Sequence, residues 1–260
     1  MIHHRRDGVG GGYEARPRIG AGRMTNRILL NNIDHHALRF SARHGAEHGD
    51  SVNQMLVFPT EFEALQREYP ILLRRGADGD YQALALLGLD RDENLFLAED
   101  GRWDARYVPA LAARGPFSIG IADQAAEPMI HVDLDDSRIG EQAGEPLFLP
   151  QGGNAPGLQR IADLLGTIYD GIELARPLFA ALDAAGLIEP VKLEIRLSET
   201  ELYALEDFCS IAPEAIAALD GETLAALNRS GHLRAAFLLL ASLGTIDALI
   251  ARKAARRALG

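Results

Sequence analysis

Histidine and carboxylate side chains, which are common zinc ligands in proteins, are densest between residues 34 and 50. The histidines of this stretch are His35, His36, His44 and His48. A helix would place His44 and His48 on one face, but Gly45 and Gly49 disfavour a helix there. His35 and His36 are neighbours in a predicted strand and would point to opposite faces. We therefore expect a solvated loop without a bound metal.

A second acidic group is followed by a glycine-containing turn. The acidic residues are Asp133, Asp135, Asp136, Glu141 and Glu145, and they lack the spacing of a calcium-binding loop. Two of them could still act as a hydrolytic carboxylate pair, because a sequence does not show the distance between carboxylates. The turn 151–154 precedes a predicted helix, whose N-terminus attracts anions, but it lacks the lysine of a phosphate-binding loop. We expect solvated loops at both places. The chain has no Gly-x-Ser-x-Gly motif, and we predict no catalytic residue.

Aromatic and arginine side chains occur together between residues 69 and 117, a mixture that suits binding surfaces and ligand pockets. The candidate binding residues are Tyr69, Arg102, Trp103, Tyr107 and Arg114. The alternative is a core in which tyrosine and tryptophan bury their rings and pair their polar atoms. We predict a site for a protein partner, a peptide or a small ligand, and we expect no cofactor. The sequence leaves both interpretations open.

Short strands and tight turns must position these residues over 24–150. Apolar runs predict strands near 28–30, 55–58, 71–74, 81–87, 117–121 and 129–134. The segment 76–80 predicts a turn between two of these strands. Phe62, Leu65 and Tyr69 lie near helical spacing, and Pro70 ends the short helix that they predict. The region therefore resembles an antiparallel sheet with few helices, and we predict an α+β fold.

A mostly helical part is expected over 151–260, after a long irregular connection at 135–157 that is the best internal boundary. An apolar stripe from residue 158 to residue 172 predicts its first helix, which Pro177 should kink or break. Alternation from Val191 to Leu197 predicts a half-buried strand. Ser198 and Glu201 form a capping-box pattern, so we predict helices at about 199–209, 213–229 with a break at Asp220-Gly221, and 232–256. We expect this part to pack on the sheet as one globule.

Charge argues against a nucleic-acid partner. The 260-residue chain has a net charge of −11, from 37 acidic residues against 26 lysines and arginines, whereas nucleic-acid binding needs a basic surface. The basic residues Arg252, Lys253, Arg256 and Arg257 are interpreted as the charged end of a helix. Cys209 is the single cysteine, so a disulfide within the chain is excluded, and we expect it to be a small buried apolar residue.

Targeting signals are absent from the sequence pattern. Residues 1–23 lack the apolar core of a secretory signal, and we interpret them as a disordered or over-called extension. The most apolar run, 235–244, is shorter than the stretch of about 20 residues that a membrane span needs. We therefore expect a cytoplasmic protein without a transmembrane segment. Export to the cell surface by a signal-independent route is the alternative.

A set of short segments occurs in a constant order over about 24–250. The segments include Leu29-Leu30-Asn31, Glu68-Tyr69-Pro70-Ile71, Ala85-Leu86-Leu87-Gly88-Leu89, Glu93-Asn94-Leu95-Phe96-Leu97, Gly101-Arg102-Trp103, Tyr107-Val108-Pro109, Gly144-Glu145-Pro146-Leu147-Phe148 and Ala241-Ser242-Leu243-Gly244. This ordered set resembles the SapC family of bacterial proteins. The sequence departs from the family at Val132-Asp133-Leu134, where relatives often carry a Cys-Ile-Asp-like stretch.

The resemblance implies a link to cell-surface or envelope systems, because the family takes its name from a surface-array gene cluster. Relatives also occur beside outer-membrane receptors and flavin-dependent tryptophan-halogenase-like proteins. It implies no catalytic residue. We predict a non-catalytic accessory or binding protein. The alternatives are an enzyme or enzyme partner in peptide or small-molecule modification, and a surface-layer component.

Overall fold

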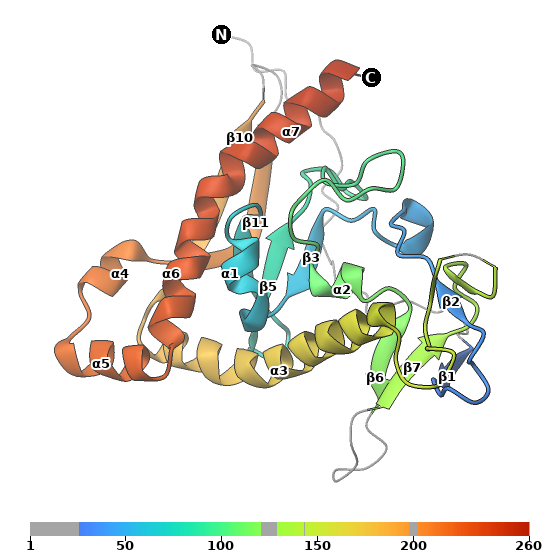
Figure 1. Cartoon of the computed structure of the whole chain (residues 1–260). Coiled ribbons are helices and arrows are strands. Elements are labelled where there is room, and N and C mark those ends of the chain that lie inside the picture. Colours follow the sequence, from blue (N-terminus) through green and yellow to red (C-terminus); the bar gives the residue numbers. More distant parts are fainter. Residues whose placement is uncertain (1–25, 121–128, 143, 198–201, 260) are drawn as a thin grey trace.

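A computed structural model of the chain describes residues 26–120, 129–142, 144–197 and 202–259 (Figure 1). These residues form three antiparallel sheets and a set of helices. The α+β fold class predicted from the sequence is confirmed.

The largest sheet takes strands from both ends of the chain. Its order is β10-β11-β4-β5-β3. The strands are β3 (Gln54–Val57), β4 (Ile71–Arg75), β5 (Tyr81–Leu86), β10 (Ile188–Arg196) and β11 (Leu202–Ile211). β4 and β5 form the expected hairpin, with Leu73 opposite Ala83, and Cys209 of β11 pairs with Leu73 on the other side of β4. The predicted sheet region and the predicted helical region therefore share one sheet.

The predicted helix 199–209 is wrong, because residues 202–211 form strand β11. Its side chains alternate between exposed and half-buried at Leu202, Tyr203, Ala204 and Leu205, and β10 pairs along its length. The register shifts between Val191 and Leu193, and Asp207 has a positive φ of 66° nearby, as at a β-bulge. Backbone hydrogen bonding to the neighbouring strands outweighs the local helix propensity of these residues. The capping-box residues 198–201 lie outside the described residues.

Two smaller sheets complete the strand content of the described residues. One has the order β1-β7-β6, and the other has the order β8-β2-β9. Their strands are β1 (Arg27–Leu29), β2 (Arg39–Phe40), β6 (Phe117–Gly120), β7 (Met129–Asp133), β8 (Ile139–Gly140) and β9 (Glu145–Pro146). The connection 135–157, predicted as irregular throughout, therefore supplies two short strands that pair with β2.

The longest helix of the described residues, α3 (Pro156–Ala184), runs below the central sheet, and it contacts β6 (Figure 1). It continues through Pro177, so the predicted break there is wrong. Leu178, Phe179 and Leu182, just after this proline, are buried in the core, and this packing outweighs the hydrogen bond that proline removes. The remaining helices are η1 (Ala46–His48), η2 (Pro59–Glu61), α1 (Phe62–Leu65), α2 (Ala110–Ala113), α4 (Pro213–Ala217), α5 (Gly221–Arg229), α6 (His232–Ser242), η3 (Leu243–Thr245) and α7 (Ile246–Leu259).

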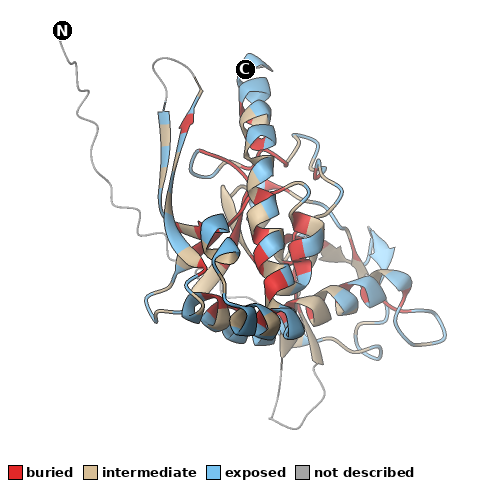
Figure 2. Cartoon of the chain, turned by 90° about the vertical axis from the view of Figure 1, so that its left-hand side faces the viewer, coloured by how far each residue is buried: buried red, intermediate tan, exposed pale blue. Residues whose placement is uncertain are grey.

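The main core lies between the central sheet and helices α1, α3, α6 and α7. The buried residues of α6 face the sheet, and its other side is exposed (Figure 2). A buried polar contact joins α6 to β4: the Ser242 hydroxyl accepts a hydrogen bond from the Ile71 N–H at 3.0 Å and donates one to the Leu239 carbonyl at 2.6 Å. A second core gathers Phe117, Val132 and the first half of α3.

The continuous helical stretch His232–Ala258 is long and apolar enough to cross a membrane by length and composition alone, because an 18-residue window within it has a mean hydropathy of 1.8. The expectation of no such stretch rested on the ten-residue run 235–244 and did not anticipate that α6, η3 and α7 join end to end. In the fold, this stretch packs on the central sheet through Leu233, Ala236, Leu239 and Leu249. It is therefore one side of the main core.

Candidate functional site

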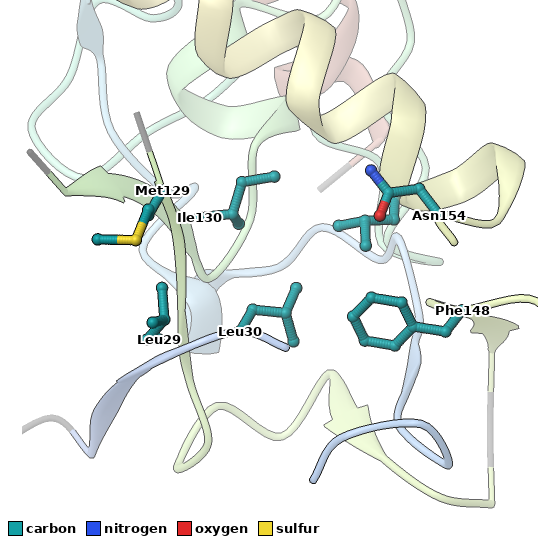
Figure 3. Close-up of a pocket in the computed structure, with 7 residues that line it drawn as sticks. Leu29, Leu30, Met129, Ile130, Phe148 and Asn154 are labelled. Carbon is teal, nitrogen blue, oxygen red and sulfur yellow. The ribbon is translucent and has the colours of Figure 1, made fainter. Parts of the chain in front are cut away.

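Two cavities among the described residues are large enough to consider as ligand sites. The first measures about 230 Å³ and lies between β1, β7 and the start of α3, where Leu30, Ile130 and Phe148 converge (Figure 3). Asn154 supplies its side-chain polar group. The second measures about 570 Å³ and is lined by charged and polar groups. Pockets for small ligands measure roughly 300–1,000 Å³. The second cavity lies within this range and the first lies below it, so the second, which we call the polar cleft, is the better candidate.

The polar cleft is assembled from three segments that lie far apart in the sequence. Residues 43–51 form one wall, residues 92–101 form another, and Arg256 reaches in from α7. The two walls are joined by the backbone, because the His44 N–H donates to the Gly101 carbonyl at 3.3 Å. A side chain at residue 101 would strike the backbone of the first wall, since a Cβ there would lie 2.7 Å from the His44 carbonyl oxygen.

A histidine–aspartate pair lies in the first wall. The Nδ1 of His44 is 3.3 Å from Oδ2 of Asp50, and the Gly45 N–H donates to the same oxygen at 3.0 Å. The turn of η1 brings these residues together, and Gly49 ends it with a φ of 85°. Asp50 is buried, so its charge orients the imidazole with Nδ1 as the donor and Nε2 as an acceptor. This arrangement can hydrogen-bond a ligand or accept a proton from one.

No serine nucleophile accompanies this pair in the described part of the cleft. Ser51 is the hydroxyl residue of the lining, and its Oγ donates to the Asp92 carbonyl at 2.5 Å rather than to His44. Asp92 itself has a positive φ of 60°, a conformation that aspartate tolerates better than most residues. The geometry therefore supports binding and proton exchange, and it does not form a Ser-His-Asp triad.

The second wall is held by a buried ion-pair group beneath it. Lys253 of α7 is 4% exposed, and its Nζ lies 2.5 Å from both Asp90 Oδ2 and Glu93 Oε1. The other carboxylate oxygen of Glu93 accepts the N–H groups of Leu89 and Asp90 at 3.0 and 3.2 Å. Burial alone would lower the pKa of Lys253, but the hydrogen bonds with Asp90 and Glu93 outweigh it and raise the pKa.

Two further arginines of α7 dock on the same loop. Arg256 donates to the Leu97 carbonyl at 2.9 Å, and Arg252 pairs with Asp104 Oδ2 at 2.8 Å while its guanidinium lies 4.4 Å from the centre of the Phe96 ring. The hydrogen bond from Arg252 is the main cause that lowers the pKa of Asp104. The basic cluster interpreted as a charged helix end thus has specific partners, and it anchors α7 against the cleft.

Three of the five predicted binding residues lie together under the cleft. The Trp103 Nε1 donates to the Tyr69 hydroxyl at 2.8 Å, and that hydroxyl donates to the Tyr107 carbonyl at 2.6 Å. Tyr69 and Trp103 are buried, and the edge of Trp103 contacts His44 with 5.1 Å between ring centres. Burial raises the pKa of Tyr69. Trp103 therefore packs against the histidine and is held in place by Tyr69, and the predicted role of these residues in binding stays a prediction.

The two predicted arginines occupy different places. Arg102 is exposed and pairs with Asp104 at 3.2 Å, on the loop that follows the cleft wall. Arg114 lies away from it and donates to the Phe117 carbonyl at 2.5 Å. Burial, and then the charges of Arg27 and Arg138, lower the pKa of Arg114. The structure therefore separates Arg114 from the aromatic group.

Metal binding finds no site in the part of the chain that the structure describes, since no three His, Cys, Asp or Glu side chains converge there. The four histidines considered from the sequence have separate contacts. His35 Nδ1 accepts from the Asn31 N–H at 3.1 Å, His36 lies beside the Ile33 carbonyl, and His48 is 3.5 Å from Glu47. In the second acidic group, Asp136 binds Arg138 and Glu145 binds Arg160.

Sequence reasoning missed Arg43, Glu99 and Arg256 as cleft residues. Nothing in their local patterns marks them, because the cleft forms only when the three segments meet. One signal was present: the family-like segments Glu93-Asn94-Leu95-Phe96-Leu97 and Gly101-Arg102-Trp103 build or support the second wall.

The sequence model of the SapC family matches residues 30–249. The chain belongs to the SapC family. In this SapC protein the matched region includes both walls of the polar cleft and ends before Arg252, Lys253 and Arg256. Searches of curated proteins and of solved structures returned no match.

Proposed function

We propose that this SapC-family protein is an accessory binding protein that holds a small zwitterionic ligand, such as an amino acid or a short peptide, in the polar cleft. The observation that carries the proposal is a pair of unpartnered opposite charges. Arg43 and Glu99 both line the cleft, and among the described residues neither side chain has a hydrogen bond or an ion pair. A carboxylate suits the arginine fork, and an ammonium group suits the glutamate.

The surrounding groups favour such a ligand. Glu47, Asp92 and Asp100 add negative charge to the lining, and Arg256 adds positive charge. His44 presents Nε2 as a further acceptor, because Asp50 binds the Nδ1 side of the ring. The family resemblance supports a role beside cell-surface or envelope systems, with the protein itself in the cytoplasm. Fractionation of native cells tests that location, and recovery with the outer envelope would favour a surface component.

Calorimetry with defined probes tests the ligand class. The probes are free L-amino acids and unblocked dipeptides, compared with their N-acetylated and C-amidated forms. We expect binding of the zwitterions, weaker binding of each blocked form, and loss of the corresponding preference in Arg43→Ala and Glu99→Ala. Equal affinity for blocked and unblocked probes, or no binding of either, would contradict the proposal.

Purification from native cells supplies the natural ligand. The chain is captured at natural abundance, and its bound small molecules and proteins are identified by mass spectrometry. Ala98→Trp fills the cleft, whereas Ala180→Trp places the same ring on the exposed side of α3 as a matched control. We expect a small molecule that is retained by the control and lost from Ala98→Trp. A ligand retained by both variants would place binding elsewhere.

A second candidate, an enzyme that uses His44 as a proton acceptor, is favoured by the His44–Asp50 pair alone. The same purified ligand distinguishes the two. Recovery of an unchanged ligand after prolonged incubation supports binding. Conversion by the wild-type protein that is lost in His44→Gln supports the enzyme.

A further inference from the structure

Strand β10 forms one edge of the central sheet over the nine residues Ile188–Arg196. It pairs with β11 on one side, and no other strand of the described residues pairs with its other side. An open edge of this length presents a row of backbone N–H and C=O groups that another strand can pair with. Pro190 lacks an N–H, and its position near the start of the strand is typical of an edge.

The side chains of β10 alternate along the edge. Val191, Leu193 and Ile195 face the main core, where Ile195 is buried. Lys192 and Glu194 lie on the opposite face, 56% and 55% exposed, where Lys192 pairs with Glu194 at 3.4 Å and with Glu206 of β11 at 3.2 Å within the same chain. When two identical strands pair in antiparallel fashion about a twofold axis, residues directly opposite each other come from the same face of the sheet. The register of such a pair is therefore decided by which charges become neighbours.

The possible registers differ in the residue of β10 that lies at their centre. Pairing centred on Lys192 sets this lysine opposite itself, and pairing centred on Glu194 sets that glutamate opposite itself. Pairing centred on Leu193 sets Lys192 of each copy opposite Glu194 of the other, and does so twice because of the symmetry. Centring on Ile195 also avoids like charges, but the overlap shrinks from residues 190–196 to residues 194–196.

We propose that β10 is a homodimerisation edge, on which two copies pair in antiparallel fashion about Leu193 with Lys192 of each copy opposite Glu194 of the other. The two central sheets then form one continuous sheet, and the core faces of both copies lie on the same side. The polar cleft takes no part in this contact, so the dimer and the proposed ligand can be tested separately.

Sedimentation velocity over a concentration series, from low to high micromolar, measures the association. We expect a monomer–dimer equilibrium. Glu194→Lys places lysines opposite each other in both symmetric pairs and should weaken dimerisation about tenfold. Adding Lys192→Glu to the same chain restores opposite charges and should restore the affinity. Glu173→Lys is the matched control, because it reverses an exposed charge on α3, away from the open edge, and should leave the affinity within about twofold.

Cross-linking tests the register. Opposed residues of an antiparallel pair have Cα atoms about 4.5–5.5 Å apart, within the range that a disulfide spans. In a Cys209→Ala background, which lacks other cysteines, Leu193→Cys should form a disulfide-linked dimer on mild oxidation. Val191→Cys should not, because residue 191 lies opposite residue 195 in this register. Melting temperatures of all variants are compared with that of the parent chain to verify folding.

Charge rescue together with selective cross-linking at residue 193 supports the proposal. A monomer at every concentration overturns it, and so does a dimer that is insensitive to Glu194→Lys or that cross-links equally through residue 191.

Discussion

The Nζ of Lys253 lies 2.5 Å from Oε1 of Glu93, and this contact fastens the last helix of the fold to a loop that is 160 residues away in the sequence. Glu93 also lines the polar cleft. The shape of the cleft and the seating of α7 therefore depend on the same ion-pair group.

Removing the lysine should destabilise the protein strongly. Lys253→Met leaves Glu93, which is largely buried, without its counter-charge, and the expected loss in the free energy of unfolding is about 3 kcal/mol. Urea unfolding measures it. Arg229→Met, at an exposed position in the last turn of α5, removes a charge of the same sign and should cost less than about 1 kcal/mol. Equal losses of unfolding free energy in the two variants would show that the ion pairs of Lys253 contribute no more than an exposed charge does.

The contribution of this group should depend on pH at both extremes. The hydrogen bond from Lys253 holds the pKa of Asp90 below its usual value of 3.8, so that stabilisation is present above pH 3.8 and is lost as pH falls through the lowered pKa. The pKa of Lys253 is raised above 10.5, so its stabilisation is present below pH 10.5 and is lost as pH rises through the raised pKa. The difference in unfolding free energy between wild type and Lys253→Met should be level in between. A difference that changes near neutral pH would contradict this assignment.

The fold should depend on the carboxylate of Glu61, because both of its oxygens accept hydrogen bonds. Its Oε1 accepts from the Ala110 N–H at 2.7 Å and the Tyr107 hydroxyl at 3.0 Å, and its Oε2 accepts from the Phe58 N–H at 3.1 Å. Burial raises the pKa of Glu61, and these hydrogen bonds oppose that change. Glu61→Gln sets an amide NH₂ against one of these donors and should cost about 1–3 kcal/mol in thermal or urea unfolding. Glu63→Gln, which loses an exposed ion pair with Arg234, should cost less than about 1 kcal/mol.

The Tyr69 hydroxyl should stabilise the floor of the cleft. Tyr69→Phe leaves the Trp103 Nε1 and the Tyr107 carbonyl without their partner, and we expect a loss of about 1–3 kcal/mol. Tyr169→Phe removes an exposed hydroxyl from α3 and is the control, with no measurable loss expected. Trp103 fluorescence reports both unfolding and local change, since the chain has one tryptophan. Similar stability of the two variants would show that the Tyr69 hydroxyl does not stabilise the protein.

Sequence patterns predicted the local elements better than their assembly. The β4–β5 hairpin follows from two apolar runs around the turn 76–80, which is a local signal. The sequence predicts a helix where β11 forms, because leucine, alanine and glutamate favour helices locally. The strand depends on pairing with β10 and with Leu73. Residue patterns do not show which distant segment a strand will meet.

The candidate site was less predictable for the same reason. Residue types predict a binding set of Tyr69, Arg102, Trp103, Tyr107 and Arg114, and the structure brings its three aromatic members together. Arg43 and Glu99 are ordinary charged loop residues in the sequence. They become candidates only because the fold leaves both side chains without partners among the described residues at one cleft. Such a combination requires tertiary structure to recognise.

The position of β4 in the central sheet has a consequence for how the chain reaches its fold. One neighbour, β5, follows within a few residues, whereas the other contact joins Leu73 to Cys209. Closing the long loop between Leu73 and Cys209 is slow. The β3–β5–β4 part should therefore form first, with the edge of β4 unpaired until β11 arrives. During synthesis on the ribosome, that waiting sheet also lacks the cover that α6 later provides, and it is the stage at which the nascent chain is most exposed to aggregation and to capture by chaperones.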